Sequence, residues 1–198
     1  PTLNNFFNKE SVNLILKKFG NPDVITSQNA LAHIDDLQGT FQKIFDILKL
    51  NGFFIFEVGY FGRVLKKELF DTIYHEHLDY HHATPLIRLL FKIGFSIKNV
   101  SLNETQGGTI RFVLKKEKIK KINKQVNSFL IMEQNSELYD YTFLNEWSIS
   151  IQKNLEKLHT YLYNENNNQV PVVGYGAPTK ATLLLELANL KKNSIDFI

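Results

Sequence analysis

A polar, histidine-rich stretch near the middle of the sequence carries the residue types best suited to acid–base chemistry. Residues 70–82 read FDTIYHEHLDYHH and contain four of the six histidines of the chain. An imidazole exchanges a proton near neutral pH, a carboxylate can orient it, and a phenol can hydrogen-bond to developing negative charge. The stretch therefore offers a general base, and the residues alone leave three interpretations open.

The first interpretation is a polar loop whose histidines pack against aromatic rings. The second is a metal site, since imidazoles and carboxylates are common ligands, and its candidate ligands are His75, Glu76, His77, His81 and His82. Residues two apart share a face only on a strand, and the spacing is not H-E-x-x-H, which weighs against a metal. The third is acid–base catalysis, and the residue pattern does not separate it from the first.

Helical and strand-like segments alternate before this stretch. Apolar residues recur at helical spacing in 9–19 and 35–48, whereas 23–30 and 53–58 are short β-prone runs. The second run, FFIFEV, is apolar enough for a strand that is buried on both faces. This alternation predicts a parallel α/β sheet. The histidine-rich stretch then follows the carboxyl end of a central strand, where open parallel sheets bind ligands.

The sheet is expected to end in an antiparallel pair. A helix is predicted over 84–93, with Thr84 as its N-cap and Pro85 at its first position. Strand-like alternation follows in 95–100 and 109–114, and a Gln-Gly-Gly turn joins the two runs. Such a strand–turn–strand unit predicts an antiparallel edge.

The rest of the chain is expected to form a linker and the start of a second domain. One or two helices are predicted between 115 and 163, and NENNNQ at 164–169 is a predicted loop. Residues 170–173, a Gly-Tyr-Gly turn and residues 179–190 then predict a strand, a turn and a helix, which open an α/β domain. The predicted class is α/β: a partial Rossmann-like sheet with an antiparallel edge, a helical linker and the start of a second Rossmann-like domain, with boundaries at 1–116, 117–164 and 165–198.

Composition excludes several classes of function. The formal net charge is only +3, and the dense basic run KKEKIKK at 115–121 is interpreted as a solvated face, so no nucleic-acid partner is expected. The absence of cysteine excludes disulfides, thiolate zinc sites and cysteine nucleophiles within these residues. No apolar run approaches the roughly 20 residues that span a bilayer. A cytoplasmic protein without a membrane partner is therefore expected.

Several strings of the sequence resemble one enzyme family. FDTIYHEHLDY, followed by QGGTIRFVL, is similar to the nucleotide-sugar C-methyltransferases. These enzymes use S-adenosylmethionine to methylate the carbon next to the ketone of a deoxy-keto-sugar linked to a nucleoside diphosphate. SQNALAHIDDL, FFIFEVGY and VVGYGAPTKATLLL extend the resemblance, in the same order, over nearly the whole chain. The resemblance implies a class I methyltransferase sheet, S-adenosylmethionine as cofactor, a keto-sugar nucleotide as substrate and an enolate as intermediate.

Residue by residue, the resemblance also implies a site without a metal. His77 matches the base that removes the proton alpha to the ketone, and Tyr74, Glu76 and His33 match positions in the same pocket. Both Tyr74 and His33 are candidates for the donor to the enolate oxygen. The residues expected at the cofactor are Asn29, Ala30 and His33. The residues expected at the substrate are Gly107, Gly108, Arg111, Gly174, Gly176 and Lys180.

Several of these residues also have a plain structural interpretation. His33 can cap a helix or pack in the core, and the glycine pair at 107–108 can be only a turn. Glu57 can reach the ligand or pair with Arg63. Arg111 can pair with a phosphate or with Glu104.

Three features lead us to expect a piece of a longer enzyme. The chain begins at Pro1 without Met and stops within SIDFI, which resembles the start of a strand. The glycine-rich turn and ribose-binding acid of the resembling family are absent, as is its cysteine-rich zinc region. We therefore expect the chain alone to be inactive and to bind S-adenosylmethionine weakly or not at all. Two alternatives stay open: a metal-dependent hydrolase that uses the histidines at 75, 77, 81 and 82, and a non-catalytic truncated remnant.

Overall fold

The computed structural model describes residues 2–167, 170–190 and 194–196. The chain forms two compact units, which are described separately. Unit 1 comprises residues 1–63 and 78–136, and unit 2 comprises residues 64–77 and 137–198.

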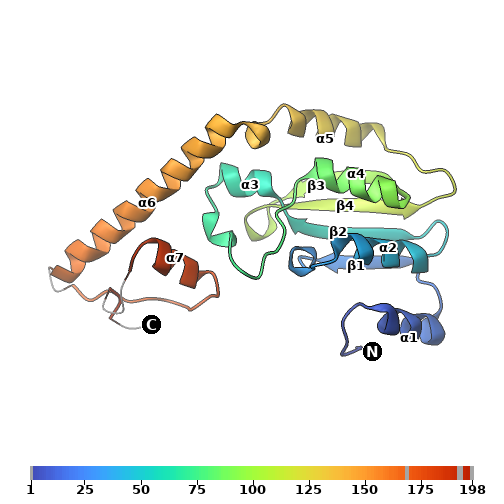
Figure 1. The fold of residues 1–198 in the computed structure, drawn as a ribbon, viewed down its shortest axis with the longest axis horizontal. Coiled ribbons are helices and arrows are strands. Elements are labelled where there is room, and N and C mark those ends of the chain that lie inside the picture. The colour runs from blue at the N-terminus through green and yellow to red at the C-terminus, as the bar shows by residue number, and fades with distance from the viewer. Residues whose placement is uncertain (1, 168–169, 191–193, 197–198) are drawn as a thin grey trace. The chain divides into compact units, whose positions relative to one another are not determined.

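Unit 1 is built on a four-stranded mixed sheet (Figure 1). The strands lie in the order β1-β2-β4-β3, with bounds Val24–Gln28, Phe53–Gly59, Thr109–Lys116 and Phe95–Asn103. β1 and β2 are parallel, and β4 is antiparallel to both β2 and β3. The predicted α/β sheet with an antiparallel edge is therefore confirmed.

The helices of unit 1 begin at residues whose side chains satisfy free backbone N–H groups. Asn8 accepts from the N–H of Ser11 and caps α1 (Lys9–Phe19), and Asp36 accepts from the N–H of Gly39 and caps α2 (Leu37–Ile47). The other helical segments here are η1 (Leu31–His33), α4 (Ala83–Ile93), η3 (Thr105–Gly107) and α5 (Lys124–Gln134), and α3 (Phe61–Lys66) begins in this unit.

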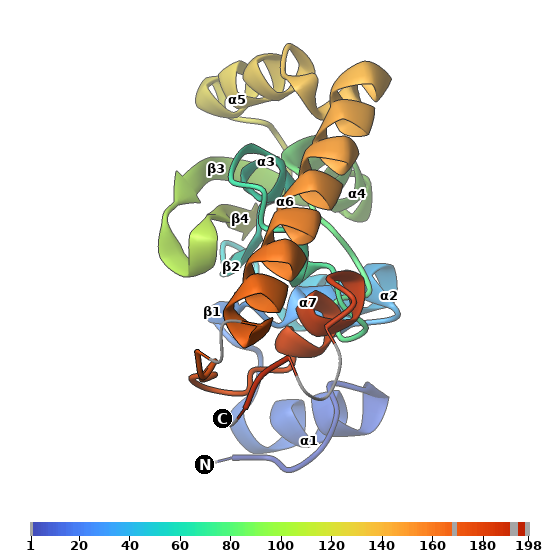
Figure 2. The ribbon, with the colours of Figure 1, turned by 90° about the vertical axis from the view of Figure 1, so that its left-hand side faces the viewer.

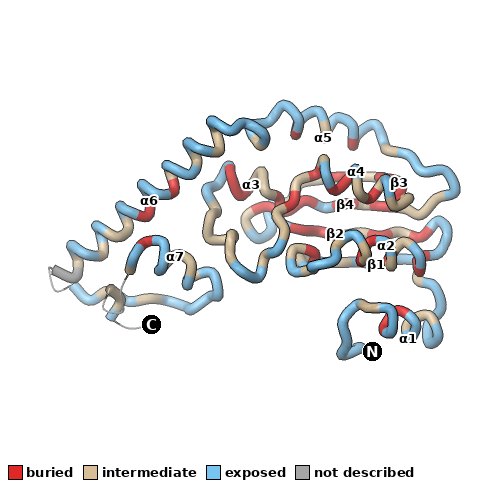
Figure 3. The backbone as a smooth tube through the Cα atoms, viewed as in Figure 1, coloured by how far each residue is buried: buried red, intermediate tan, exposed pale blue. Residues whose placement is uncertain are grey.

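α2 and α4 cover one face of the sheet, as both ribbon views show (Figures 1 and 2). The ring of Phe41 in α2 lies 6.1 Å from that of Phe54 and 5.7 Å from that of Phe56, and all three side chains are fully buried. Buried residues concentrate in the sheet and in these helices (Figure 3). Phe53 and Ile55, which alternate with the buried pair, are only half-buried. The face of β2 opposite α2 is therefore only partly buried at these two residues, whereas Glu57, on that same face, is buried.

A buried carboxylate caps α4. The helix begins at Ala83, so Thr84 and Pro85 are not its N-cap and first residue as predicted. The carboxylate of Glu133, on α5, accepts from the N–H of Ala83 (2.7 Å), the N–H of Thr84 (2.6 Å) and the Thr84 hydroxyl (2.5 Å). The cap comes from a residue about 50 positions later in the chain, so the local sequence does not reveal it.

Unit 2 contains the segment 64–77 and the helices α6 (Tyr141–Asn167) and α7 (Ala181–Leu187), with the short turns η2 (Phe70–Thr72) and η4 (Glu137–Tyr139). α6 continues through 164–167, where a loop was predicted. Neither α6 nor any other helix in the described part of the chain combines the length and apolarity needed to cross a membrane. The small core of unit 2 consists of Ile151, Leu155 and Ala188, with Phe70, Trp147, Leu158, Leu184 and Leu190 packed against it.

The strand predicted at 170–173 does not form in the described part of unit 2. Val172 instead exchanges two hydrogen bonds with Asp196: its N–H donates to the carboxylate (2.6 Å), and its carbonyl accepts from the Asp196 N–H (2.9 Å). The predicted helix is present in shorter form as α7. The domain boundaries at 116/117 and 164/165 stay predictions.

Replacement of Glu133 tests the cap of α4. Glu133→Gln keeps the shape but removes the charge that strengthens three hydrogen bonds, so we expect a loss of about 1–3 kcal/mol in the free energy of unfolding. Urea unfolding at neutral pH measures it. Glu146→Gln, on an exposed turn of α6, is the matched control and should change stability little.

The stability difference between wild type and Glu133→Gln should also depend on pH. Burial raises the pKa of Glu133, but hydrogen bonds from His82, Thr84 and the backbone of Ala83 and Thr84 outweigh it and lower the pKa from 4.5 to about 2. A lowered folded-state pKa stabilises the fold above pH 4.5, and this contribution is lost as the pH falls toward 2. The stability difference between wild type and Glu133→Gln should shrink over that range. A difference that stays constant below pH 4.5 would contradict the assignment.

Candidate active site

Unit 1 gathers the residues predicted at the cofactor around the carboxyl end of β1. Asn29 and Ala30 follow the strand directly, and His33 ends the single turn η1. Asn29 has φ 49°, and its N–H donates to the carbonyl of Glu57 in β2 at 2.8 Å. Ala30 and His33 are exposed. Open α/β sheets bind ligands at this edge, so the placement agrees with the predicted role, which stays a prediction.

The carboxylate of Glu57 is the centre of this edge. Its side chain is buried and accepts from the hydroxyls of Thr105 (2.6 Å) and Thr109 (2.5 Å). It also accepts from the amide of Asn103 (3.0 Å) and from Nε and Nη2 of Arg111 (2.9 and 2.7 Å). The carboxylate thus holds together β2, β3, β4 and the turn η3.

These contacts fix the charge of Glu57. The hydrogen bonds from Thr105 and Thr109, followed by that from Arg111, outweigh the effect of burial and lower the pKa of Glu57 from 4.5 to about 2. The carboxylate therefore stays ionised near neutral pH. With so low a pKa it is a poor proton acceptor, so Glu57 is a structural anion and not a candidate base.

Glu57 and Arg111 pair with each other and not with the partners considered from the sequence. Arg63 pairs instead with Glu104, with 2.6 Å between Nη2 and Oε1. The register of β2 and β4 places Glu57 directly opposite Arg111, and directly opposed side chains lie on the same face of a sheet. A substrate contact of Arg111 stays a prediction, and 45% of its side chain is exposed.

The glycines at 107 and 108 are required by the backbone. Gln106, Gly107 and Gly108 have φ values of 50°, 89° and 136°, a run of left-handed conformations that glycine adopts without strain. A Cβ on Gly108 would also lie 2.5 Å from Cγ of Arg63. The two glycines thus form a turn, and whether they also contact the substrate stays a prediction.

Unit 2 holds the predicted catalytic residues of the 70–77 segment. Nδ1 of His77 lies 2.8 Å from the carbonyl oxygen of Thr72. A carbonyl only accepts, so Nδ1 donates, and the lone pair of the neutral imidazole is on Nε2. The ring of Tyr74 lies 4.5 Å from that of His77. The contact with Thr72 therefore selects the tautomer in which Nε2 can accept a proton.

The phenol of Tyr74 is held in its protonated form. Burial raises its pKa, and the charge of Glu76 and a hydrogen bond to it raise the pKa further, while Lys180 acts in the opposite direction. Tyr74 is therefore a hydrogen-bond donor at neutral pH. His77 and Tyr74 together provide a proton acceptor and a donor on one short segment.

Lys180 lies near the same segment. Its Nζ is 2.5 Å from Oδ2 of Asp71, and 48% of the lysine side chain is exposed. Gly176, with φ 78°, and Gly174 precede it in the irregular segment 174–178, and a Cβ on Gly176 would meet no atom within 4 Å. Asp71 was not among the site residues predicted from the sequence. Its charge is opposite to that of Lys180, which was the only available signal for this pair.

The segment 64–77, which carries the predicted catalytic residues, is anchored to α6. The carboxylate of Glu68 accepts from the hydroxyl of Ser150 (2.6 Å) and the amide of Asn154 (3.0 Å). Phe70 packs against the small core that Ile151 and Leu155 form. The position of the segment within unit 2 is therefore set by polar and apolar contacts with one helix.

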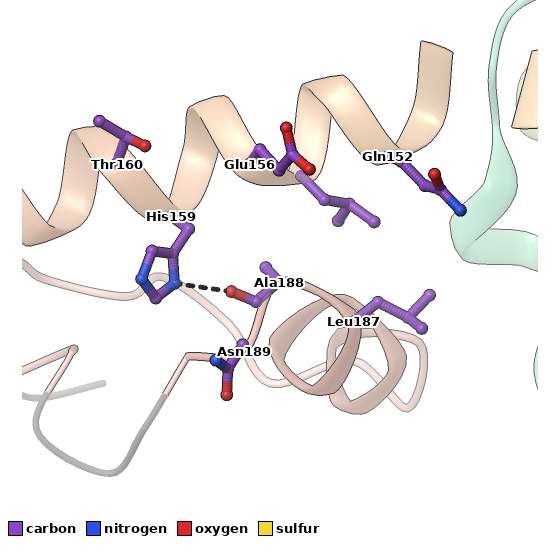
Figure 4. A pocket seen from close by; sticks show the side chains of 8 residues that line it. Gln152, Glu156, His159, Thr160, Leu187, Ala188 and Asn189 are labelled. Carbon is purple, nitrogen blue, oxygen red and sulfur yellow. Dashed lines mark hydrogen bonds between the residues drawn. The ribbon is translucent and has the colours of Figure 1, made fainter. Parts of the chain in front are cut away.

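A shallow cavity of about 360 Å³ lies between α6 and α7 (Figure 4). Nδ1 of His159 donates to the carbonyl of Ala188 at 2.9 Å across one end of it. Gln152, Glu156 and Asn189 add polar groups to its wall. None of the predicted site residues lines this cavity.

The histidines of the metal interpretation do not form a metal site in the described part of the chain, where no three His, Cys, Asp or Glu side chains are grouped to hold an ion. The carbonyl of His81 accepts from the N–H of Phe61 (2.8 Å), and burial lowers the pKa of its imidazole. Nδ1 of His82 lies 3.6 Å from Glu133. Both imidazoles thus lie within unit 1.

Comparison with known proteins gives two sequence relationships. Residues 104–198 match the family described as the C-methyltransferase C-terminal domain. The chain is also 26% identical, over 184 residues, to the C-methyltransferase NovU of Streptomyces niveus. The match covers 92% of this chain and 44% of NovU, so the chain spans less than half the length of that relative.

Solved methyltransferase structures overlap with about half of the chain. N-methyltransferase NodS from Bradyrhizobium japonicum WM9, in complex with S-adenosyl-L-homocysteine, is 11% identical with a TM-score of 0.36, over 48% of this chain and 45% of NodS. Magnesium protoporphyrin IX methyltransferase from Synechocystis PCC 6803 is 14% identical with a TM-score of 0.39, over 52% of this chain and 48% of that one.

The turn at 106–108 generates a stability prediction. Gly108→Ala places a methyl group against the stem of Arg63 at a backbone conformation that L-residues rarely adopt. We therefore expect the free energy of unfolding to fall by about 1–3 kcal/mol. Gly59→Ala, at the same end of the sheet in the neighbouring strand β2, opposite Thr109, meets no atom within 4 Å and should be nearly neutral. Thermal unfolding of both variants measures the difference. Equal melting temperatures would show that the turn tolerates a side chain.

Proposed function

We propose that this chain belongs to an S-adenosylmethionine-dependent enzyme that methylates the carbon alpha to the ketone of a nucleotide-linked deoxy-keto-sugar. The similarity of residues 104–198 to the C-methyltransferase C-terminal domain and of the chain to a C-methyltransferase supports the proposal. The observation that carries this proposal is the tautomer of His77. Nδ1 donates to Thr72, which leaves Nε2 as the proton acceptor, and the Tyr74 ring lies 4.5 Å away.

Methylation of carbon explains why a base is needed. A carbon next to a ketone is not a nucleophile until it loses a proton. In the proposed reaction Nε2 of His77 takes that proton, and the electrons of the C–H bond form the double bond of an enolate. The enolate carbon then forms a bond to the methyl group, and the electrons of the broken C–S bond stay on sulfur.

The enolate oxygen requires a hydrogen-bond donor. The phenol of Tyr74, whose pKa is raised, is protonated at neutral pH and lies on the same segment as the base. We assign the donor to Tyr74, with Glu76 orienting the phenol through the hydrogen bond between them. His33, the second candidate, lies on an exposed turn of unit 1.

Polar groups in each unit are suited to the two ligands. When bound, S-adenosylmethionine supplies an electrophilic methyl group, and Asn29, Ala30 and His33 would contact it at the carboxyl end of β1. In unit 2 the ammonium of Lys180 and the backbone of the glycine-containing segment 174–176 would hold the diphosphate of the substrate. Lys180 would then exchange Asp71 for a phosphate oxygen.

Substitution of His77 tests the assignment of the base. In the protein that carries this chain, supplied with S-adenosylmethionine and a nucleoside-diphosphate 4-keto-sugar, His77→Asn should lower the rate of methyl transfer about 100- to 10,000-fold. Mass spectrometry of the sugar nucleotide measures the product.

His75→Asn is the matched control, because His75 lies two residues away and 77% of its side chain is exposed. We expect it to keep near-wild-type turnover. Equal rates for His77→Asn and wild type would remove His77 from the reaction, and no methylated sugar from the wild-type protein would favour the non-catalytic alternative.

A further inference from the structure

The guanidinium of Arg63, in α3 directly after β2, has one hydrogen-bond donor paired and one unpaired within the described part of the chain. Nη2 of Arg63 donates to Oε1 of Glu104 at 2.6 Å. Nε of the same side chain is buried and has no hydrogen-bond partner among the residues that the structure describes. A buried donor without an acceptor is destabilising, so its presence at a ligand-binding edge indicates an acceptor that is supplied from outside the chain.

Nε and Nη2 of Arg63 form a pair of adjacent donors, called the fork below. The Nε–H and Nη2–H of arginine point in the same direction and fit two oxygens of a carboxylate or a phosphate. Glu104 uses one of the two donors. An anion that used both would make one more charge-assisted hydrogen bond than Glu104 does.

The fork is held in place by the turn below it. The stem of Arg63 packs against Gly108, where an added Cβ would lie 2.5 Å from Cγ and 2.6 Å from Cβ of the arginine. The N–H of Arg63 donates to the carbonyl of Tyr60 at 2.9 Å, directly after β2. The guanidinium is therefore positioned in advance, which lowers the entropic cost of binding an anion.

Glu104 is a partner that another anion can displace. Its side chain is 67% exposed, whereas that of Arg63 is 24% exposed. Ion pairs with such exposed carboxylates contribute little, because water competes for both groups. The arginine keeps its position through Gly108 when the carboxylate leaves.

We infer that Arg63 binds an oxyanion of the reaction's ligands, and that the carboxylate of Glu104 occupies the position of this oxyanion until the ligand binds. The inference rests on the proposed function, which supplies two such groups: the diphosphate of the sugar nucleotide and the carboxylate of the methionine part of the cofactor. Both present the paired oxygens that the fork requires. Arg63 follows β2 at the edge where open α/β sheets bind ligands.

Titration calorimetry of the protein that carries this chain tests the inference with two probes, thymidine diphosphate and S-adenosylhomocysteine. Arg63→Gln should weaken the binding of one probe about tenfold or more, and Arg63→Lys, which keeps the charge but lacks the fork, should weaken it to a smaller extent. Glu104→Gln removes the competitor and should leave that affinity unchanged or increase it. Loss of thymidine diphosphate binding identifies the diphosphate, and loss of S-adenosylhomocysteine binding identifies the carboxylate.

A purely structural ion pair gives a different pattern. Arg63→Gln and Glu104→Gln would then weaken binding alike, since each breaks the same contact. Arg88→Gln, which removes an exposed arginine from α4, controls for the general loss of positive charge. The inference is wrong if the two pair variants behave alike, if Arg63→Gln matches Arg88→Gln, or if the wild-type protein binds neither probe. Binding is measured without turnover, so this outcome is separate from a failure of methyl transfer.

Discussion

The edge of the unit 1 sheet at the carboxyl ends of β1 and β2 depends on one buried charge, the carboxylate of Glu57. Its side chain joins β2 to Asn103, Thr105, Thr109 and Arg111, while its backbone carbonyl accepts from the residue that follows β1. A buried carboxylate is stable only when its oxygens are saturated with donors. The strand ends and the turn η3 must therefore stay together, and the same turn supports the stem of Arg63 through Gly108.

In unit 2, hydrogen bonds also fix the predicted catalytic side chains and the segment that carries them. The carbonyl of Thr72 selects the tautomer of His77, and Glu76 accepts from the phenol of Tyr74. Glu68, bonded to Ser150 and Asn154, fastens the segment to α6. These polar contacts fix which nitrogen of His77 donates and keep the phenol of Tyr74 protonated, as the proposed base and donor require.

The sequence predicts the elements with periodic patterns and misses contacts between distant residues. The strands of the sheet and the helices α1, α2 and α6 follow from apolar spacing and caps. The cap of α4 by Glu133 and the pairing of Glu57 with Arg111 could not be predicted, because they depend on strand register and on helix packing. The segment predicted as a strand at 170–173 is not assigned as one among the residues that the structure describes.

The candidate site was predicted more from family resemblance than from residue chemistry. Residue types alone left the histidine-rich stretch open between packing, metal binding and catalysis. The structure separates the histidines: His81 and His82 enter the packing of unit 1, whereas His77 lies in unit 2 beside Tyr74. The sequence did not reveal the orphaned Nε of Arg63, because burial of a single atom has no signature in a pattern of residue types.

The exchange of the substrate's alpha proton for deuterium tests the central claim most directly. A nucleoside-diphosphate 4-keto-sugar would be incubated in heavy water with the protein that carries this chain and S-adenosylhomocysteine, so that deprotonation occurs without methyl transfer. If His77 is the base, the wild-type protein exchanges the proton next to the ketone and His77→Asn exchanges it only at the rate of the free sugar. Exchange at the wild-type rate by His77→Asn would contradict the account.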